Sequence, residues 1–193
     1  GHPVATICAG RTDAGVHALA QVVHFDTASG RPDTAWTRGA NANLPAGIAV
    51  QQTSVVDASF HARFSATQRC YRYLIWRSAT RHPLWAGRAA WVHRPLDVIA
   101  MRQAAVHLTG QHDFSAFRSS QCQARSPVRN LSVLELTERD ELLCIDVQAN
   151  AFLHHMVRNL VGALVWIGMG RRPPDWAAQV LTSRDRRMAA PTM

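Results

Sequence analysis

A regular alternation of residue types between residues 68 and 76 constrains the fold of this chain more than any other feature. One of the two alternating sets is Arg69, Tyr71, Tyr73 and Ile75. Because successive side chains of a strand point to opposite faces of a sheet, the alternation predicts a β-strand. Two more β-rich stretches, 130–137 and 142–148, are separated by a short polar turn, which predicts an antiparallel hairpin.

Weaker patterns predict the remaining elements. Further strands are expected over residues 4–9, 16–26, 48–56 and 88–93. Helices are expected over 34–41 after Asp33, over 98–109 between a capping Asp97 and a terminating Gly110, over 151–168 after a capping Asn150, and over 175–183. In the second of these helices, the side chains expected to face inward are Ile99, Met101, Ala105 and Leu108. The segments between these elements are expected to be loops, and the residues after 183 a polar tail.

The order of these elements predicts an α+β fold. We expect two similar units, each an antiparallel sheet with helices on one face, and a basic cleft between them. The first unit would span residues 1–58, a connecting segment 59–67, and the second unit 68–193. At 193 residues with 47% hydrophobic side chains, the chain can bury a core.

The predicted helix over 151–168 is apolar on two rows and polar on another side. Its apolar rows are Phe152, Met156, Leu160 and Leu164, and Leu153, Val157, Val161 and Val165. The other side would carry His154, Arg158 and Gly162. The longest apolar run of the chain, 160–169, is shorter than the roughly 20 residues that span a bilayer, so no membrane segment is predicted.

The charge of the chain points to a polyanionic partner. There are 21 basic and 13 acidic residues, and every basic residue is Arg, which gives a formal net charge of +8. Arginine grips phosphate bidentately and stacks on bases, so RNA is the expected partner. The absence of lysine by itself is better explained by the composition of a GC-rich genome. The net charge still indicates a polyanionic partner, because such a bias replaces Lys by Arg without creating a positive excess.

The cysteines and histidines favour neither a disulfide framework nor a metal site. The four cysteines lie tens of residues apart, and the ten histidines do not have the spacing of metal ligands. The N-terminal residues show no export signal. We therefore expect free thiols, no metal and a location in the cytoplasm.

Asp13 is the first candidate for catalysis, within the sequence Gly-Arg-Thr-Asp-Ala-Gly. Arg11 lies two residues before it, so in extended backbone both side chains project to the same side and the guanidinium can hold the carboxylate ionised. Gly15 permits a turn with positive φ that brings the aspartate to the end of a strand. The alternative is an ordinary turn in which Asp13 only shapes the backbone.

Two other groups of residues are candidates for the same site. Arg158 stands among polar neighbours near the predicted start of its helix, where a cation is unfavourable unless an anion such as phosphate or Asp13 is close. Tyr71 and Tyr73 share a strand face with Arg69, which is typical of surfaces that stack bases. A solvated helix face and ordinary core packing are the respective alternatives.

Several ordered motifs resemble the TruA-type tRNA pseudouridine synthases. They are Ala-Gly-Arg-Thr-Asp-Ala-Gly-Val-His at 9–17, Gln-Val-Val-His-Phe at 21–25, Asn-Ala-Asn-Leu-Pro at 41–45, Phe-His-Ala-Arg-Phe-Ser-Ala at 60–66, Tyr-Arg-Tyr at 71–73 and Ala-Asn-Ala-Phe-Leu-His-His-Met-Val-Arg-Asn-Leu-Val-Gly at 149–162. The resemblance covers essentially the whole chain. Members of the family also carry a strand and helix before the aspartate motif and a strand at their end, so the resemblance implies that this chain is a fragment.

The resemblance implies a function and roles for these residues. The family isomerises uridine to pseudouridine at tRNA positions 38, 39 and 40 in the anticodon stem-loop, as a homodimer without cofactor or metal. Asp13 would be the catalytic aspartate, with Arg11, Tyr71 and Arg158 as supporting residues of the active site. The basic and aromatic character of the neighbouring motifs suggests RNA contacts for Arg63, Arg69, His154 and His155. A non-catalytic RNA-binding module is the alternative, and a metal-dependent nuclease or deaminase is disfavoured by the absence of ligand spacing.

Overall fold

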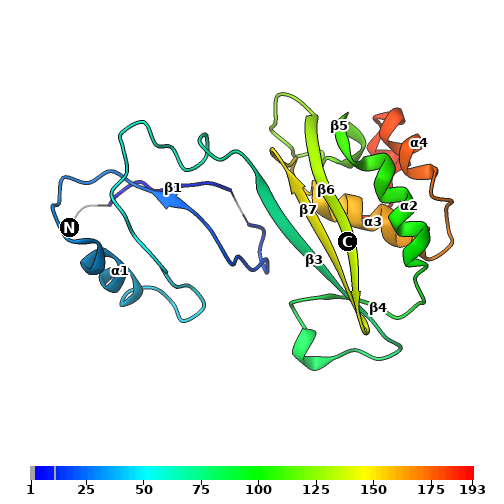
Figure 1. Cartoon of the computed structure of the whole chain (residues 1–193), viewed down its shortest axis with the longest axis horizontal. Helices are drawn as coiled ribbons and strands as arrows, with labels where there is room; N and C mark the ends of the chain where they lie inside the picture. The colour runs from blue at the N-terminus through cyan, green and yellow to red at the C-terminus, as the bar shows by residue number, and fades with distance from the viewer. Residues whose placement is uncertain (1–2, 11) are drawn as a thin grey trace. The chain divides into compact units, whose positions relative to one another are not determined.

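The computed structural model describes residues 3–10 and 12–193. By its internal contacts the chain divides into two compact units (Figure 1). Unit 1 comprises the residues up to 13 together with 18–66, and unit 2 comprises 14–17 together with 67–193. The expected boundaries at residues 58 and 68 stay a prediction.

Unit 1 contains a short antiparallel pair of strands. β1 (Ile7–Cys8) pairs with β2 (Val23–His24), and Ile7 lies opposite His24. The expected pairing of the first two strands is confirmed, but strands over 4–9 and 16–26 are wrong in length. Beyond this ladder, the Ala9 amide donates to the Val22 carbonyl at 2.8 Å.

The helix of unit 1 forms where it was expected. α1 (Asp33–Asn41) is preceded by Pro32 at its N-cap position, so Asp33 is its first residue and not its cap. The strand expected over 48–56 is absent from the described structure. Instead, the Asn41 side chain donates to the Val50 carbonyl at 2.9 Å and accepts from the Val50 amide at 2.7 Å. These two bonds satisfy backbone groups that a neighbouring strand would otherwise have paired.

Unit 1 has little buried interior of its own among the residues that the structure describes. Ala62 is its one described residue in the buried class. Large apolar side chains remain exposed on both strand regions, including Ile7 at 39% and Val22 at 51%. Hydrogen bonds and aromatic contacts, rather than a packed core, hold this unit together.

The sheet of unit 2 has the strand order β4-β3-β7-β6-β5. β3 (Arg69–Arg77), β6 (Val128–Arg139) and β7 (Leu142–Ala149) are the three strands expected from alternation and from the hairpin pattern. All three are confirmed, and they pair antiparallel. The hairpin turn places Asp140 at a positive φ of 52°. A short polar side chain is among the few that tolerate this conformation.

The two outer strands depart from the expectation. β4 (Ala90–Val92) falls within the predicted 88–93, but it pairs parallel to β3, so the sheet is mixed and not wholly antiparallel. A 12-residue connection containing the 3₁₀ turn Pro83–Trp85 carries the chain back to the start of the new strand, which permits the parallel direction. β5 (Gly110–Asp113), which pairs with β6, was expected to be loop. The four residues of β5 are small or polar, so the sequence shows no alternating pattern there that would predict a strand.

Helix α2 (Val98–Leu108) begins as its sequence predicts. The Asp97 carboxylate accepts from the Ala100 amide at 2.9 Å, which confirms the cap. Gly110 follows the helix at a φ of 110°. The expected inward position of Ile99 is wrong, since 67% of this residue is exposed and Val98 is buried in its place. Met101, Ala105 and Leu108 are buried as expected, and Ala104 is buried as well, because the helix packs against both the sheet and a second helix.

Helix α3 (Met156–Gly168) begins five residues later than expected. Asn150 is not its cap, because the Asn150 carboxamide oxygen instead accepts from the amides of Asn130 and Ala151, at 3.0 and 2.9 Å. His155 takes the N-cap position with a φ of 59°. Placing Gly162 on a polar side was also wrong: it is buried, and the Pro191 carbonyl lies directly against it.

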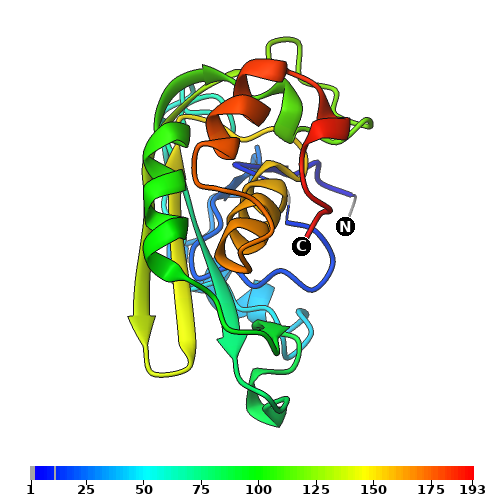
Figure 2. The ribbon, with the colours of Figure 1, turned by 90° about the vertical axis from the view of Figure 1, so that its right-hand side faces the viewer.

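The helices lie on one face of the sheet of unit 2 (Figure 2). α4 (Trp176–Ser183) follows α3 and packs with α2. The expected polar tail is in part packed structure, with a 3₁₀ turn at Arg186–Met188 and a buried Ala190. A third such turn, Ser115–Phe117, packs against α4. The large buried side chains of this core include Phe114, Phe117, Leu143, Ile145, Leu160 and Leu164.

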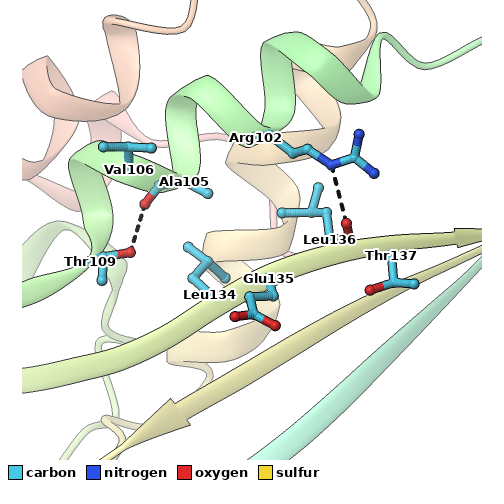
Figure 3. Close-up of a pocket in the computed structure, with 8 residues that line it drawn as sticks. All are labelled: Arg102, Ala105, Val106, Thr109, Leu134, Glu135, Leu136 and Thr137. Carbon is cyan, nitrogen blue, oxygen red and sulfur yellow. Dashed lines mark hydrogen bonds between the residues drawn. The ribbon is translucent and has the colours of Figure 1, made fainter.

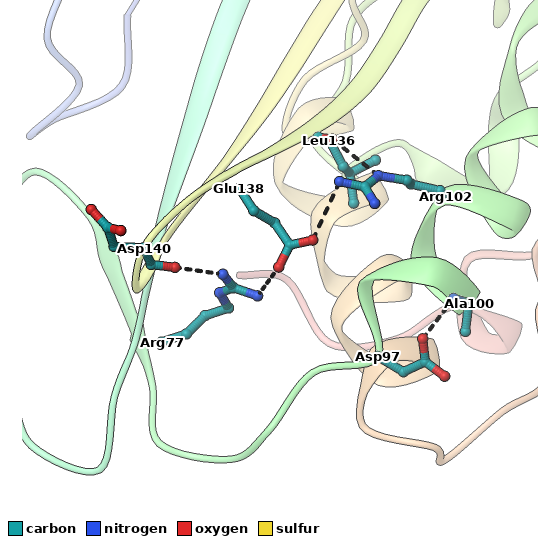
Figure 4. A network of polar contacts seen from close by, with 7 residues as sticks. All are labelled: Arg77, Asp97, Ala100, Arg102, Leu136, Glu138 and Asp140. Atoms are coloured by element: carbon teal, nitrogen blue, oxygen red, sulfur yellow. Dashed lines mark hydrogen bonds and ion pairs between the residues drawn. The ribbon is translucent and has the colours of Figure 1, made fainter.

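A polar network ties the hairpin to both β3 and α2 (Figure 4). Glu138 pairs with Arg77 at 2.7 Å and with Arg102 at 3.3 Å. Arg77 also donates to the Asp140 carbonyl, and Arg102 to the Leu136 carbonyl. The two arginines therefore fix the hairpin end of the sheet to the helix layer.

The combination of helices with separate and largely antiparallel strands confirms the α+β class. Among the described residues, no helix has the length and apolar character needed to cross a bilayer. All four cysteines lie in the described part of the chain and are free thiols.

Candidate active-site residues

Asp13 lies in the loop that joins β1 to β2 in unit 1. The base of this loop is closed by the bond from Ala9 to Val22 and by the Gln21 side chain, which donates to the Gly10 carbonyl at 2.7 Å. Gly15 has a φ of 81°, which confirms the expected positive-φ turn. Asp13 itself is exposed. The loop therefore presents an accessible carboxylate from a backbone that is anchored at its base.

Arg11 lies outside the described residues. Its expected support of the Asp13 carboxylate stays a prediction.

The motif at 60–66 packs onto β2 through His24. The Ala62 amide donates to Nδ1 of His24 at 3.1 Å. The His24 ring meets the His61 ring with centroids 4.9 Å apart, and His61 stacks on Phe64 at 4.2 Å. These contacts join the second and fourth motifs of the resemblance inside unit 1.

Arg63, a candidate for RNA contact, belongs to this cluster. Its guanidinium carbon lies 5.9 Å from the centre of the Phe64 ring. Both residues are exposed. A cation over an exposed aromatic ring is a surface on which a base or a phosphate can bind.

In unit 2, Tyr71 lies beside the segment that leads into α3. Its ring meets the Phe152 ring edge to face, with centroids 5.1 Å apart. The register of the sheet explains this contact, because Tyr71 is paired with Val147 and the chain leaves β7 two residues later. Arg69, at the start of the same strand, donates to the Asn150 carbonyl at 2.9 Å.

Tyr73 is the inner member of the tyrosine pair, and it interacts with Arg158. Burial raises the pKa of the Tyr73 phenol above its ordinary value, and the positive charge of Arg158 opposes this shift only in part. The phenol is therefore neutral, and it is close enough to the guanidinium to interact with its charge. Burial of Tyr73 supports the packing interpretation of this residue, while its electrostatic interaction with Arg158 links the strand to α3.

Arg158 is half-buried and not part of a solvated helix face. Its Nε donates to the main-chain oxygen of Met193 at 2.5 Å. His154 and His155 precede it by four and three residues, and their ring centroids are 3.9 Å apart. The His154 main chain is held by the 118–122 loop, through the bonds from Ser119 N to His154 O at 2.9 Å and from His154 N to the Cys122 sulfur at 3.4 Å.

Several residues that contact or support the candidate site residues were not predicted from the sequence to do so. Gln21, His24, Phe152 and Asn159 each make a specific contact in the structure. The available signal was polarity: Gln21 and His24 interrupt an apolar strand, and Asn159 interrupts an apolar helix. A polar residue at a position expected to be buried usually has a defined hydrogen-bond partner.

Unit 2 also carries a hollow of about 320 Å³ between α2 and β6 (Figure 3). It is lined by Arg102, Ala105, Val106, Thr109, Leu134, Glu135, Leu136 and Thr137. None of these residues belongs to a motif of the resemblance. This hollow is therefore separate from the candidate residues.

Comparison with known proteins identifies the family. A family model described as tRNA pseudouridine synthase matches residues 104–193. The chain is 62% identical over 187 residues to tRNA pseudouridine synthase A of Bordetella petrii, an alignment covering 97% of this chain and 70% of that protein. It is 58% identical over 192 residues to the enzyme of the same name from Bordetella avium, and 54% identical over 192 residues to that of Dechloromonas aromatica. These alignments cover 100% of this chain and 72% and 73% of those proteins. The chain belongs to the tRNA pseudouridine synthase family.

Proposed function

We propose that this protein is a tRNA pseudouridine synthase, an isomerase that converts uridine to pseudouridine at positions 38, 39 and 40 in the anticodon stem-loop. The identity of 54–62% to proteins named tRNA pseudouridine synthase A supports this function most directly. The observation of the structure that fits it best is the exposed Asp13 carboxylate on its anchored loop.

The reaction needs no atom from outside the substrate. Pseudouridine is an isomer of uridine: the C1′–N1 bond breaks, the uracil turns, and C1′ joins C5, whose proton is lost while N1 gains one. Hence no redox or group-transfer cofactor is required. Because a stacked uracil cannot be reached in a stem, the nucleotide is expected to flip out of the helix before it reacts.

Asp13 is proposed as the catalytic residue. An ionised carboxylate can attack the ribose or the base, or remove a proton from the sugar. All three routes require the carboxylate itself and not merely a polar side chain of its size. This requirement makes an amide substitution at Asp13 the decisive change.

Tyr71 and Arg158 are proposed to support the reaction. An aromatic ring can stack on the flipped uracil, and the edge-to-face contact with Phe152 limits the orientations that the Tyr71 ring can take. The Arg158 guanidinium can hold a phosphate of the substrate or the developing charge. Arg63, Arg69, His154 and His155 are proposed to contact the RNA backbone around the reacting nucleotide.

We further propose that the active protein is a cytoplasmic homodimer that uses no metal. The chemistry itself supports the last point, because proton transfers and a carboxylate are sufficient for the isomerisation. Gel filtration with light scattering measures the oligomeric state, and the activity after exhaustive chelation measures the dependence on metal.

The test is pseudouridine formation on an anticodon stem-loop RNA, comparing the wild type with Asp13→Asn. Turnover of the variant should fall below detection, while its RNA affinity changes less than about tenfold, or about 1.4 kcal/mol. Asp26→Asn is the matched control, since Asp26 is another exposed carboxylate of unit 1, and this variant should keep full turnover. Pseudouridine formation by Asp13→Asn would refute the catalytic assignment. Binding without turnover by the wild type would favour the RNA-binding module instead.

A further inference from the structure

The buried polar residue Asn159 connects α3 to the last residues of the described chain. Asn159 is 1% exposed and is the one polar residue in the buried class among those that the structure describes. Its Nδ2 donates to the Phe117 carbonyl at 2.8 Å. Its Oδ1 accepts from Thr192 Oγ1 at 2.6 Å and from Arg186 at 3.2 Å. A polar group this deeply buried is costly unless it is satisfied, and the bond from Thr192 ties segment 189–193 to this satisfied group.

Arg186 completes the attachment of segment 189–193. It donates to the carbonyl of Ala189 at 3.3 Å, to that of Ala190 at 2.9 Å, and to the Thr192 hydroxyl at 3.1 Å. The guanidinium thereby contacts both the segment and Asn159. Gly162 lets the Pro191 carbonyl approach the helix, because no side chain stands in the way. The segment is thus fixed along one side of α3.

The far end of this segment holds Arg158. The Met193 amide donates to the Arg158 carbonyl at 3.3 Å, and the Arg158 Nε donates to the Met193 main-chain oxygen. One of the five N–H groups of the guanidinium is used in this bond. Because Arg158 is a long and flexible side chain, fixing its Nε removes much of its rotational freedom.

We infer that Asn159, acting through Thr192 and segment 189–193, is a positioning residue that fixes the Arg158 guanidinium for the reaction. The inference rests on the proposed function for its catalytic consequence, but the geometry that it describes can be measured without activity. Asn159 touches neither substrate nor reacting atoms in this scheme. It acts because Arg158 is preorganised only while the segment is held.

The test variant is Thr192→Val, which keeps the shape of the side chain and removes its hydroxyl. It leaves α3 unaltered, unlike a change of Asn159 itself. Thr192→Ser restores the hydroxyl and should restore the wild-type behaviour. Thr109→Val is the matched control: it removes a threonine hydroxyl that donates to the Ala105 carbonyl at 3.0 Å, at the end of α2.

The first readout is independent of activity. In a ¹⁵N-resolved proton spectrum, the Arg158 Nε–H should exchange slowly with solvent in the wild type and in Thr109→Val. We expect its exchange to be at least about tenfold faster in Thr192→Val and normal in Thr192→Ser. Loss of the resonance in Arg158→Lys assigns it. An unchanged exchange rate in Thr192→Val would overturn the inference.

The second readout is catalytic. Thr192→Val should lower single-turnover pseudouridine formation about tenfold with little change in RNA affinity, because misplacing a positioned group slows the reaction more than it weakens binding. In an Arg158→Lys background, which lacks the Nε bond, Thr192→Val should have no additional effect. Equal effects in both backgrounds would show that Thr192 does not act through Arg158. If the wild type forms no pseudouridine, the proposed function fails, and the exchange measurement still decides the inference.

Discussion

The ring of Tyr71 meets the ring of Phe152 edge to face, with their centroids 5.1 Å apart and their planes at 78°. These residues are 81 positions apart in the sequence. The pairing of β3 with β7 brings them together, since Phe152 follows the end of β7 by three residues. Phe152 therefore restricts the ring that is proposed to stack on the uracil.

Replacing Phe152 by Leu tests this restriction. An edge-to-face pair contributes about 0.5–1.5 kcal/mol beyond its buried area, so Phe152→Leu should reduce the rate of pseudouridine formation up to about tenfold. Phe25→Leu breaks a similar pair in unit 1, in which the ring centroids of Phe25 and Trp36 are 5.4 Å apart, and serves as the control. Single-turnover rates of both variants measure the difference. Equal losses would mean that Phe152 has no special relation to Tyr71.

Gly162→Ala should destabilise unit 2 although alanine favours helices. A Cβ at this position would overlap the Pro191 carbonyl, so the segment 189–193 must shift, at a cost of about 1–3 kcal/mol. Gly39→Ala in α1 is the matched control, because a Cβ there meets nothing within 4 Å, and it should stabilise its helix by up to about 1 kcal/mol. Native-state amide exchange in α3 and α1 reports the two effects separately. Unchanged protection of α3 in Gly162→Ala would contradict the close packing of the Pro191 carbonyl.

Asp113 predicts a specific dependence of stability on pH. Burial alone would raise the pKa of its carboxyl, but the hydrogen bonds from Ser115 and the charges of Arg184 and Arg118 outweigh it, so the pKa lies below its ordinary value. Because the pKa is lowered in the folded state, the ionised carboxylate stabilises the fold at pH values above the ordinary pKa of 3.8. This stabilisation is lost as the pH falls through the folded-state pKa.

Asp113→Asn should therefore lower the free energy of unfolding at pH 7 by up to about 1 kcal/mol, and the difference from the wild type should shrink at acidic pH. The small magnitude reflects the exposure of its partner Arg184, whose side chain is 69% exposed. Glu141→Gln, an exposed carboxyl of the hairpin turn, is the control. Urea unfolding between neutral and acidic pH measures both. A difference that stays constant with pH would refute the stabilising role of the Asp113 carboxylate.

The affinity for RNA should fall as salt rises, because arginine contacts to phosphate release counterions. The slope of log affinity against log salt is negative, and Arg63→Gln and Arg69→Gln should each reduce its magnitude by about 1. Arg102→Gln is the control, since this arginine is paired with Glu138 on the helix face of unit 2. Fluorescence anisotropy with a labelled anticodon stem-loop gives the slopes. A flat salt profile of the wild type would count against tRNA as the partner.

The sequence by itself determined the elements whose pattern is local. Alternation predicted β3, the β-rich stretches around a polar turn predicted the β6–β7 hairpin, and Asp97 predicted the start of α2, because side-chain periodicity and capping act over a few residues. The glycine after Asp13 predicted the positive-φ turn for the same reason. The ordered motifs also indicated the family, because each motif is a contiguous run of residues.

Tertiary structure decided what depends on partners far away in the chain. α3 begins at Met156 because Asn150 bonds to Asn130, 20 residues earlier, and so does not cap the helix. β5 exists because β6 offers an edge, although its own four residues carry no pattern. Asn159 meets Phe117 and Thr192, at separations of 42 and 33 residues. No local periodicity encodes such contacts, since a buried polar group is satisfied only by whichever distant atoms the fold brings within hydrogen-bond reach.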